Sequence, residues 1–283
     1  MRIFHCLAAL ALSGAAWGAP IEAGSVQHQH KTLIDPTSAV WNNQPESLVT
    51  MAPQNIAKPI LKEPVFKQLK VRGAVSQGWL FLRLEWDDKT RDAELTKALF
   101  TDACAVEFAV KGDAKDTSPF MGNPGKPVQL IHWKAIWQDD IEKGYRDVEH
   151  GYPNMYYDYY PLAKGKKAQD IQGAALMYNP GRYVNNPISQ IDRKDPVEEM
   201  VAEGFGTSTT QKHLDARAWG NHSSGHWAVV VARPLSTPDP ADAQIKPGAT
   251  IPVAFALWDG ATKNRGGRKH FAMWSELKVG GGK

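Results

Sequence analysis

An alternation of apolar and polar residues between positions 67 and 87 constrains the fold more than any other feature of this sequence. A Ser-Gln-Gly turn at 76–78 divides the segment into two parts of strand length. Because successive side chains of a strand point to opposite faces, the pattern predicts a β-hairpin with one buried face. The residues expected on that face are Leu69, Val71, Val75, Leu80, Leu82, Leu84 and Trp86.

Other apolar segments of strand length follow, separated by glycine and proline turns. The predicted strands lie at 69–75, 79–86, 104–110, 128–137, 226–233, 250–258 and 268–278. We therefore expect an all-β fold, an antiparallel β-sandwich with long loops and few short helical turns. This domain is expected at 65–283, after an extended N-terminal segment at 19–64 with at most one short strand.

Residues 138–225 show the weakest periodicity, and we expect a loop-rich insertion laid over the sandwich, with one helical turn in 197–206. An aromatic stretch at 152–160 suits either the lid of a pocket or a docking surface for a partner chain. A solvated acidic turn is favoured over catalytic carboxylates for Asp139, Asp140 and Glu142.

The first 18 residues have the features of a Sec signal peptide. Arg2 supplies a positive n-region, Ile3–Leu12 is largely apolar, and small residues precede a cleavage point after Gly18 or Ala19. We therefore expect export to the periplasm. No later run of about 18 apolar residues predicts a membrane span.

Charge and cysteine content argue against several classes of function. The chain has 33 Lys and Arg residues against 30 Asp and Glu residues, and the signal peptide removes only Arg2 from this balance. Such a balance argues against a nucleic-acid partner. After loss of Cys6, Cys104 is the only cysteine, so the mature chain has no internal disulfide and no Cys-x-x-Cys-His motif for covalent haem attachment.

Two motifs stand out, one near the C-terminus and one in a mid-chain loop. The first is Ala254–Gly260, an apolar strand ending in Trp-Asp-Gly, followed by Asn264–Lys269 and Trp274. The second is a Phe-Met-Gly loop around Met121 that leads into Pro127–Ala135. Together they resemble signatures of the haem b-binding gamma subunits of type II DMSO reductase family molybdoenzymes, which include ethylbenzene dehydrogenase, dimethylsulfide dehydrogenase, chlorate reductase and selenate reductase.

The resemblance covers roughly residues 65–279 and implies a function. In that family a methionine and a lysine are the axial ligands of a non-covalent haem b, and the matching positions are Met121 and Lys269. It further implies a non-catalytic subunit in a heterotrimer with an iron–sulfur (beta) subunit and a molybdenum catalytic (alpha) subunit, and a c-type cytochrome as redox partner. Lysine ligates only as the free amine, so burial and the charge of iron must favour its deprotonation. With both axial positions filled by protein, the expected role is electron transfer.

Other interpretations of these residues compete with ligation. A loop methionine often fills a gap between aromatic rings, and a lysine beside a turn usually keeps its amine in water. His132 is the rival ligand, because imidazole is the usual ligand of haem iron. Lys263 lies in the same hairpin, but we prefer Lys269, which is predicted to share a core-directed strand face with Phe271 and Met273.

A different class of function also fits the composition. A secreted carbohydrate-binding β-sandwich without haem would use its aromatic residues, among them 10 Trp and 8 Tyr, to stack on sugar rings. Such a module needs neither Met121 nor Lys269 and predicts a colourless protein.

Overall fold

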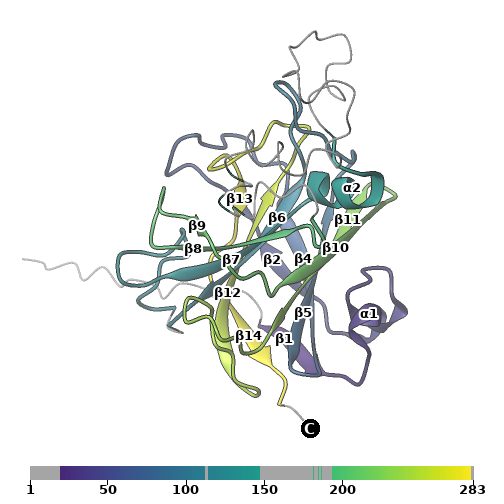
Figure 1. Cartoon of the computed structure of the whole chain (residues 1–283), viewed down its shortest axis with the longest axis vertical. Helices are drawn as coiled ribbons and strands as arrows, with labels where there is room; N and C mark the ends of the chain where they lie inside the picture. The colour runs from purple at the N-terminus through teal and green to yellow at the C-terminus, as the bar shows by residue number, and fades with distance from the viewer. Residues whose placement is uncertain are drawn as a thin grey trace, which may run out of the picture.

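Fourteen strands form one continuous sheet in the computed structural model of this protein, which describes residues 20–111, 114–146, 181, 184, 186 and 193–281 (Figure 1). The strands are β1 (Ile21–Ser25), β2 (Ser47–Thr50), β3 (Ala52–Pro53), β4 (Gln68–Ser76), β5 (Trp79–Asp87), β6 (Ala103–Ala109), β7 (Val128–Lys134), β8 (Val197–Ala202), β9 (Thr209–Thr210), β10 (Arg217–Ser223), β11 (His226–Pro234), β12 (Thr250–Trp258), β13 (His270–Phe271) and β14 (Ser275–Val279). The helical segments are α1 (His30–Leu33), η1 (Ala39–Asn43) and α2 (Ala135–Lys143).

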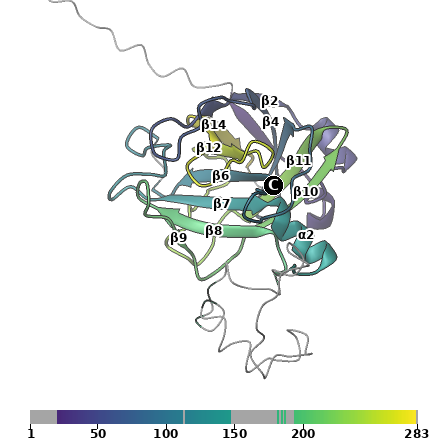
Figure 2. The same cartoon turned by 90° about the horizontal axis from the view of Figure 1, so that it is seen from above.

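The sheet folds back on itself, so that two halves pack face to face (Figure 2). One half has the order β10-β11-β5-β4, the other has the order β12-β6-β7-β8-β9, and β1 and β14 join them. Every described strand pairing is antiparallel except those of β1, which runs parallel to both β4 and β14. The predicted all-β sandwich is confirmed, with β1 as the exception to its antiparallel arrangement.

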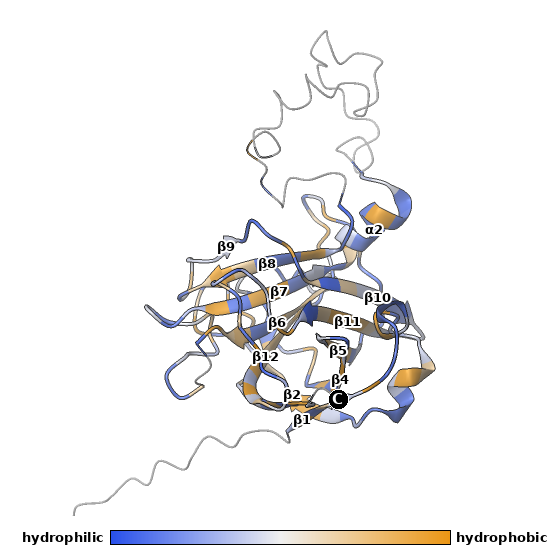
Figure 3. Ribbon diagram, turned by 60° about the horizontal axis from the view of Figure 1, so that its bottom comes forward, coloured by the Kyte–Doolittle hydropathy of each residue, from blue (hydrophilic) through white to orange (hydrophobic). Residues whose placement is uncertain are grey.

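Residues from both halves form one apolar core between them. All seven residues predicted for the buried face of the 67–87 hairpin lie in this core. From the opposite half, Trp133 of β7 packs edge to face against Trp227 of β11, with ring centroids 5.0 Å apart. Hydrophobic residues concentrate on the strands of both halves (Figure 3). Interdigitation of two inner faces in this way is the packing expected of a sandwich.

The predicted strand at 128–137 ends early, because the chain turns into α2 after Lys134. Gln138 of α2 stabilises this turn: it accepts hydrogen bonds from the Trp133 indole at 3.2 Å and the Gly220 N–H at 2.7 Å. The prediction of a solvated acidic turn is also wrong, since the Asp139 carboxylate is buried on α2. Its partners are the cationic side chains of Arg91, Lys143 and Arg146.

Residues 197–223 are not loops over the sandwich but the strands β8, β9 and β10 of the sheet itself. The predicted helical turn at 197–206 is wrong for a physical reason. Glu199 points into the core side of β8, where the backbone N–H groups of Asp215 and Ala216 donate to its carboxylate. An acid at an inward position hides the alternation that marks a strand.

The N-terminal segment holds more structure than expected, namely β1, β2 and β3 with two helical segments. β1 lies inside the sheet, where Ile21 pairs with Leu277 and is fully buried. At the other end, the single strand predicted at 268–278 is split into β13 and β14, and between them the Ala272 N–H donates to the oxygen of Phe255 at 2.9 Å.

Some predictions fall on residues that the structure does not describe. The signal peptide at 1–18 and the aromatic stretch at 152–160 both lie outside the described residues. Within the described part of the chain, none of the helices is long and apolar enough to cross a membrane.

We expect Gly220→Ala to lower the free energy of unfolding by about 1–3 kcal/mol, which thermal or denaturant unfolding measures. A Cβ at Gly220 would lie 2.6 Å from Cζ2 of Trp133, so the indole must move out of the core contact. Gly24→Ala in β1 is the matched control, because its nearest atom would be 3.9 Å away. Equal losses in the two variants would contradict the role given to the Trp133 contact.

Candidate functional site

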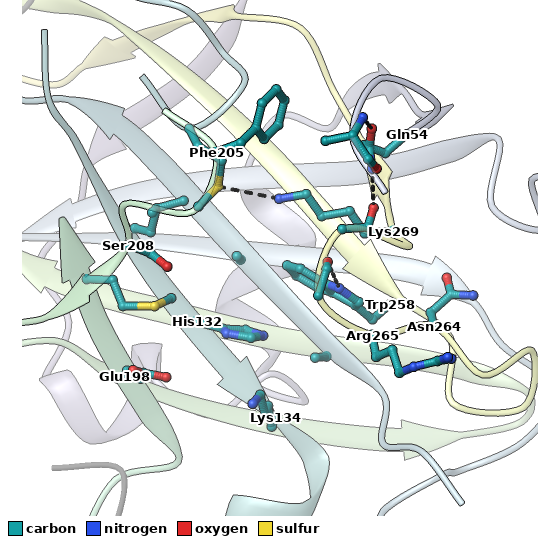
Figure 4. A pocket seen from close by; sticks show the side chains of 18 of the residues that line it. Gln54, His132, Lys134, Glu198, Phe205, Ser208, Trp258, Asn264, Arg265 and Lys269 are labelled. Atoms are coloured by element: carbon teal, nitrogen blue, oxygen red, sulfur yellow. Dashed lines mark hydrogen bonds between the residues drawn. The ribbon is translucent and has the colours of Figure 1, made fainter. Parts of the chain in front are cut away.

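A cavity of about 510 Å³ lies on the outer face of β12, β6, β7 and β8, on the side away from the core (Figure 4). Because side chains alternate along a strand, the neighbours of the core residues in these strands point outward. The strand residues that line the cavity are Ala103, Ala105, Leu130, His132, Lys134, Glu198, Met200 and Trp258. The volume falls within the range of about 300–1,000 Å³ that is usual for small-molecule sites.

Small side chains create this space. Ala103 and Ala105 of β6 and Ala256 of β12 form an apolar cluster with Trp258. In the strand register Ala105 pairs with Ala256, and Ala103 pairs with Trp258. Three adjacent methyl groups leave the sheet surface hollow, where larger side chains would fill it.

Loops from distant parts of the sequence build the walls of the cavity. They contribute Gln54, Ala57, Lys58, Leu95, Phe100, Thr101, Met121, Phe205, Gly206, Ser208, Asn264, Arg265, Gly266, Gly267 and Lys269, and the short edge strand β9 adds Thr210. The buried Gln54 side chain donates to the oxygens of Ala57 at 2.7 Å and Gly267 at 2.6 Å, and so ties the N-terminal segment to the last hairpin. We did not predict this wall, because the residues around Gln54 do not alternate between apolar and polar as those of a strand do.

The loop at 117–127 presents Met121 to the cavity in an unusual backbone conformation. Met121 has a φ of +68°, a left-handed value that costs a non-glycine residue about 1 kcal/mol or more. Gly122 follows at +74°, and a Cβ there would lie 2.8 Å from a backbone oxygen. The Gly204 N–H holds Met121 by donating to its oxygen at 2.6 Å, and the Trp274 indole donates to the first residue of the loop at 2.7 Å. The surrounding structure therefore imposes the position of this methionine.

Lys269 meets Met121 across the cavity wall. Its Nζ lies 3.6 Å from the Met121 Sδ, although the two residues are 148 positions apart in the chain (Figure 4). The same amine lies 5.1 Å from the centre of the Trp258 ring. Burial lowers the pKa of Lys269 from its usual value, and the Glu107 carboxyl opposes that shift. Burial therefore favours the free amine, the form in which lysine binds a metal.

Glu107 is an acidic residue in an otherwise apolar strand, β6. The carboxyl group of Glu107 lies beside the Met121 backbone, and its charge faces Lys269. Burial raises the pKa of Glu107, and the Lys269 cation and the Met121 backbone oppose that rise. Glu107 is not among the predicted site residues, although an acid within the apolar run from Cys104 to Val110 is a visible signal.

The predicted strand face of Lys269 is wrong in one respect. His270 and Ala272 of the return segment are buried, and Ala272 belongs to the core between the halves, whereas Trp274 is buried in a separate apolar cluster with Leu130 and Ala254. Lys269 lies on the opposite, outer side, and Met273 on that side is 53% exposed. Lys263 is exposed in the turn, with a left-handed φ of +62°, and only Lys269 of the two lysines lines the cavity.

His132, the rival ligand, lies on the floor of the same cavity. Its ring stacks on Trp258 at 4.7 Å and contacts Trp137 edge to face at 5.8 Å. Burial and the positive charges of Lys134 and Lys269 hold the pKa of His132 well below its usual range, so the imidazole is neutral at pH 7. Its buried Nε2 has no hydrogen-bond partner within the described residues.

A group of buried carboxylates lies beside the cavity, at the ends of β5, β6 and β12. Oxygen atoms of Asp88, Asp102 and Asp259 lie within 4.8 Å of one another. Asp102 accepts hydrogen bonds from the Gly260 N–H at 2.9 Å and the Trp227 indole at 2.9 Å, and so links both sheet halves. Burial, with the negative charge of Asp88, raises the pKa of Asp102 to about 7. Burial also raises the pKa of Asp88 to about 7.

Because these pKa values are higher in the folded than in the unfolded chain, the protein should lose stability as pH rises from about 4 to about 7. We expect Asp88→Asn to weaken this dependence and to raise the free energy of unfolding at pH 8, since it removes one negative charge from the group. Denaturant unfolding at pH 5 and pH 8 measures both effects. Asp87→Asn, at a neighbouring residue whose side chain is 88% exposed, is the control and should keep the wild-type slope.

Three curated relatives match most of this chain. It is 27% identical over 285 residues to the chlorate reductase subunit gamma of Ideonella dechloratans, covering 95% of this chain and 94% of the relative. It is 27% identical over 248 residues to the dimethylsulfide dehydrogenase subunit gamma of Rhodovulum sulfidophilum, and the match covers 84% of this chain and 72% of the relative. It is 24% identical over 264 residues to a Haloferax mediterranei protein that is provisionally named as a respiratory nitrate reductase heme subunit, and the match covers 93% of this chain and 73% of the relative.

Among solved structures, a family 9 carbohydrate-binding module from Caldicellulosiruptor kristjanssonii in complex with glucose is similar. The match covers 94% of this chain and 97% of the module, at 8% identity and a TM-score of 0.43. A likeness of this degree supports no inference about function.

The family model described as ethylbenzene dehydrogenase matches residues 38–270, which include both Met121 and Lys269. The match spans well over half of the sequence. This chain therefore belongs to the ethylbenzene dehydrogenase family.

Proposed function

We propose that this chain is the haem b subunit of a periplasmic molybdenum oxidoreductase. In this role it passes electrons between the iron–sulfur subunit of that enzyme and an external redox partner such as a c-type cytochrome. The observation that carries the proposal is the approach of Lys269 Nζ to Met121 Sδ, 3.6 Å apart at the wall of a cavity. Family membership supports it, because two relatives are named as gamma subunits of oxidoreductases and a third as a heme subunit.

The residues of the cavity fit a haem group. A thioether and a free amine are donors that iron accepts, and here they face each other from two separate loops. The alanines of β6 and β12 provide a flat apolar surface. Haem bound at this site would supply one-electron transfer.

The chain's own residues limit the chemistry to that transfer. If Met121 and Lys269 hold both axial positions, no position remains for a substrate, so we propose that this subunit is not catalytic. The anchored backbone of Met121 and the side chain of Lys269 would hold the group that carries the electron.

The charges of the cavity favour an acidic ligand over a neutral sugar. Among the described residues that line it, Lys58, Lys134 and Arg265 are cationic besides Lys269, the proposed iron ligand, and Glu198 is the only acid. Haem carries two propionate carboxylates, which can pair with these cations. A neutral sugar has no negative charge to pair with them.

The first test is the visible spectrum of the protein, oxidised and then reduced, purified with haem supplied. We expect the sharp reduced bands of six-coordinate low-spin haem in the wild type. Met121→Ala and Lys269→Ala should each remove one ligand and give a high-spin or mixed spectrum. Lys263→Ala is the matched control and should keep the wild-type spectrum.

Two outcomes would contradict this assignment. A wild type that takes up no haem removes the cytochrome proposal and directs the search to polysaccharides. A His132→Ala variant that loses the low-spin bands, while Met121→Ala retains them, makes His132 the ligand instead.

The second test concerns the location and the partners. We propose Sec export with cleavage after residue 18 or 19, and assembly with an iron–sulfur and a molybdenum subunit. Native protein isolated from the periplasmic fraction should then start at residue 19 or 20 and co-elute with two further chains and with molybdenum. Elution as a lone chain would instead indicate a stand-alone electron carrier.

A further inference from the structure

We propose that the end of the cavity around Lys134 is a carboxylate-binding subsite, in which Lys134 and His132 bind the propionate groups of haem. This inference rests on the proposed function, and it adds the residues that recognise the acidic edge of the ligand.

Lys134 lies at the end of the cavity away from Glu107, the residue that contacts Met121. In the strand register Glu107 pairs with Leu130, whereas Ala103 pairs with Lys134. Leu130 and Lys134 are four residues apart on one face of β7, which corresponds to about 13 Å along the strand. The cavity therefore has a Met121 end and a separate cationic end.

The Lys134 amine is a half-buried cation without an acidic partner among the described residues. Within the described residues, no carboxylate lies within 4.0 Å of its Nζ, which instead lies 4.4 Å from the centre of the Trp137 ring. Burial lowers the pKa of Lys134, and the more distant Glu198 carboxylate opposes this shift. Glu198 already accepts a hydrogen bond from the Thr210 hydroxyl at 2.5 Å. Burying an uncompensated cation is costly, so an anionic ligand at this end would restore the balance.

Two further groups at this end offer hydrogen-bond donors. His132 is two residues before Lys134 on the same face of β7, and its buried Nε2 lacks a partner within the described residues. As a neutral imidazole it can donate one N–H to a carboxylate. Arg265 lies on the adjacent wall, with its guanidinium 4.9 Å from the centre of the Phe100 ring. Within the described part of the chain, one of its side-chain donors bonds to the backbone, to the oxygen of Lys263 at 3.0 Å.

The contribution of this subsite can be measured by comparing the binding of haem with that of haem dimethyl ester, in which both carboxylates are esterified. The mature full-length chain, freed of haem, is titrated with each compound, and the dissociation constants are compared between variants. Wild type should bind haem more tightly than the diester. Lys134→Gln should weaken haem binding about tenfold or more, because a charge-assisted hydrogen bond is lost, and should leave binding of the diester unchanged.

Two variants control for effects on folding. Lys134→Arg keeps the positive charge and should retain the preference for haem over the diester. Lys278→Gln changes an exposed lysine on β14, paired with Glu22 at 2.9 Å, and should behave as wild type. The reduced spectrum of Lys134→Gln should keep its low-spin bands, because its Met121 and Lys269 are intact.

Three results would overturn the subsite. The first is equal affinity of the wild type for haem and its diester. The second is a loss of affinity in Lys134→Gln that is the same for both compounds. In these two cases a low-spin spectrum would leave the proposed function standing. A wild type that binds neither compound would overturn both proposals together.

Discussion

Packing between the two sheet halves is the contact on which the rest of the structure depends. Trp133 and Trp227 pack against each other there, and the side chains on the inner faces of the central strands form the core. Because side chains alternate along a strand, the residues that enter the core determine which of their neighbours face outward. On β7, Trp133 points into the core, whereas His132 and Lys134 line the cavity. One strand thus supplies both the core and the candidate site, and a change in its register would destroy both together.

The sheet also determines how the loops present their side chains. Glu107, in the middle of β6, lies beside the Met121 backbone, and the Gly204 N–H in the segment after β8 donates a hydrogen bond to the oxygen of Met121. A rigid strand therefore stabilises a strained loop residue. Gln54 plays the same part for the final hairpin, since it joins the backbone near Lys269 to the N-terminal segment. Residues far apart in the chain meet because each is tied to a neighbouring part of one sheet.

The parts of the fold that could be predicted from the sequence are the strands in which apolar and polar residues alternate and the apolar ones are those that are buried. The 67–87 hairpin was predicted correctly because its apolar residues fall on one face and all of them enter the core. β8 was missed because Glu198 faces a cavity and Glu199 is buried among backbone donors, so neither face of the strand is apolar in sequence. Met121 and Lys269 were singled out by family resemblance, whereas their approach, the alanine floor and Glu107 depend on strand register, which a single sequence does not contain.

The position of β1 has a consequence for how the chain folds. Ile21 pairs with Leu277, and the same strand pairs with β4 on its other edge, so the first and last described strands are neighbours in the middle of the sheet. The two halves cannot be joined until residues near 279 are available, and closing a loop of that length is slow because the contacts it gains are distant in sequence. Folding must therefore finish after the whole chain has been made, and an exported chain would complete its sheet only on the far side of the membrane.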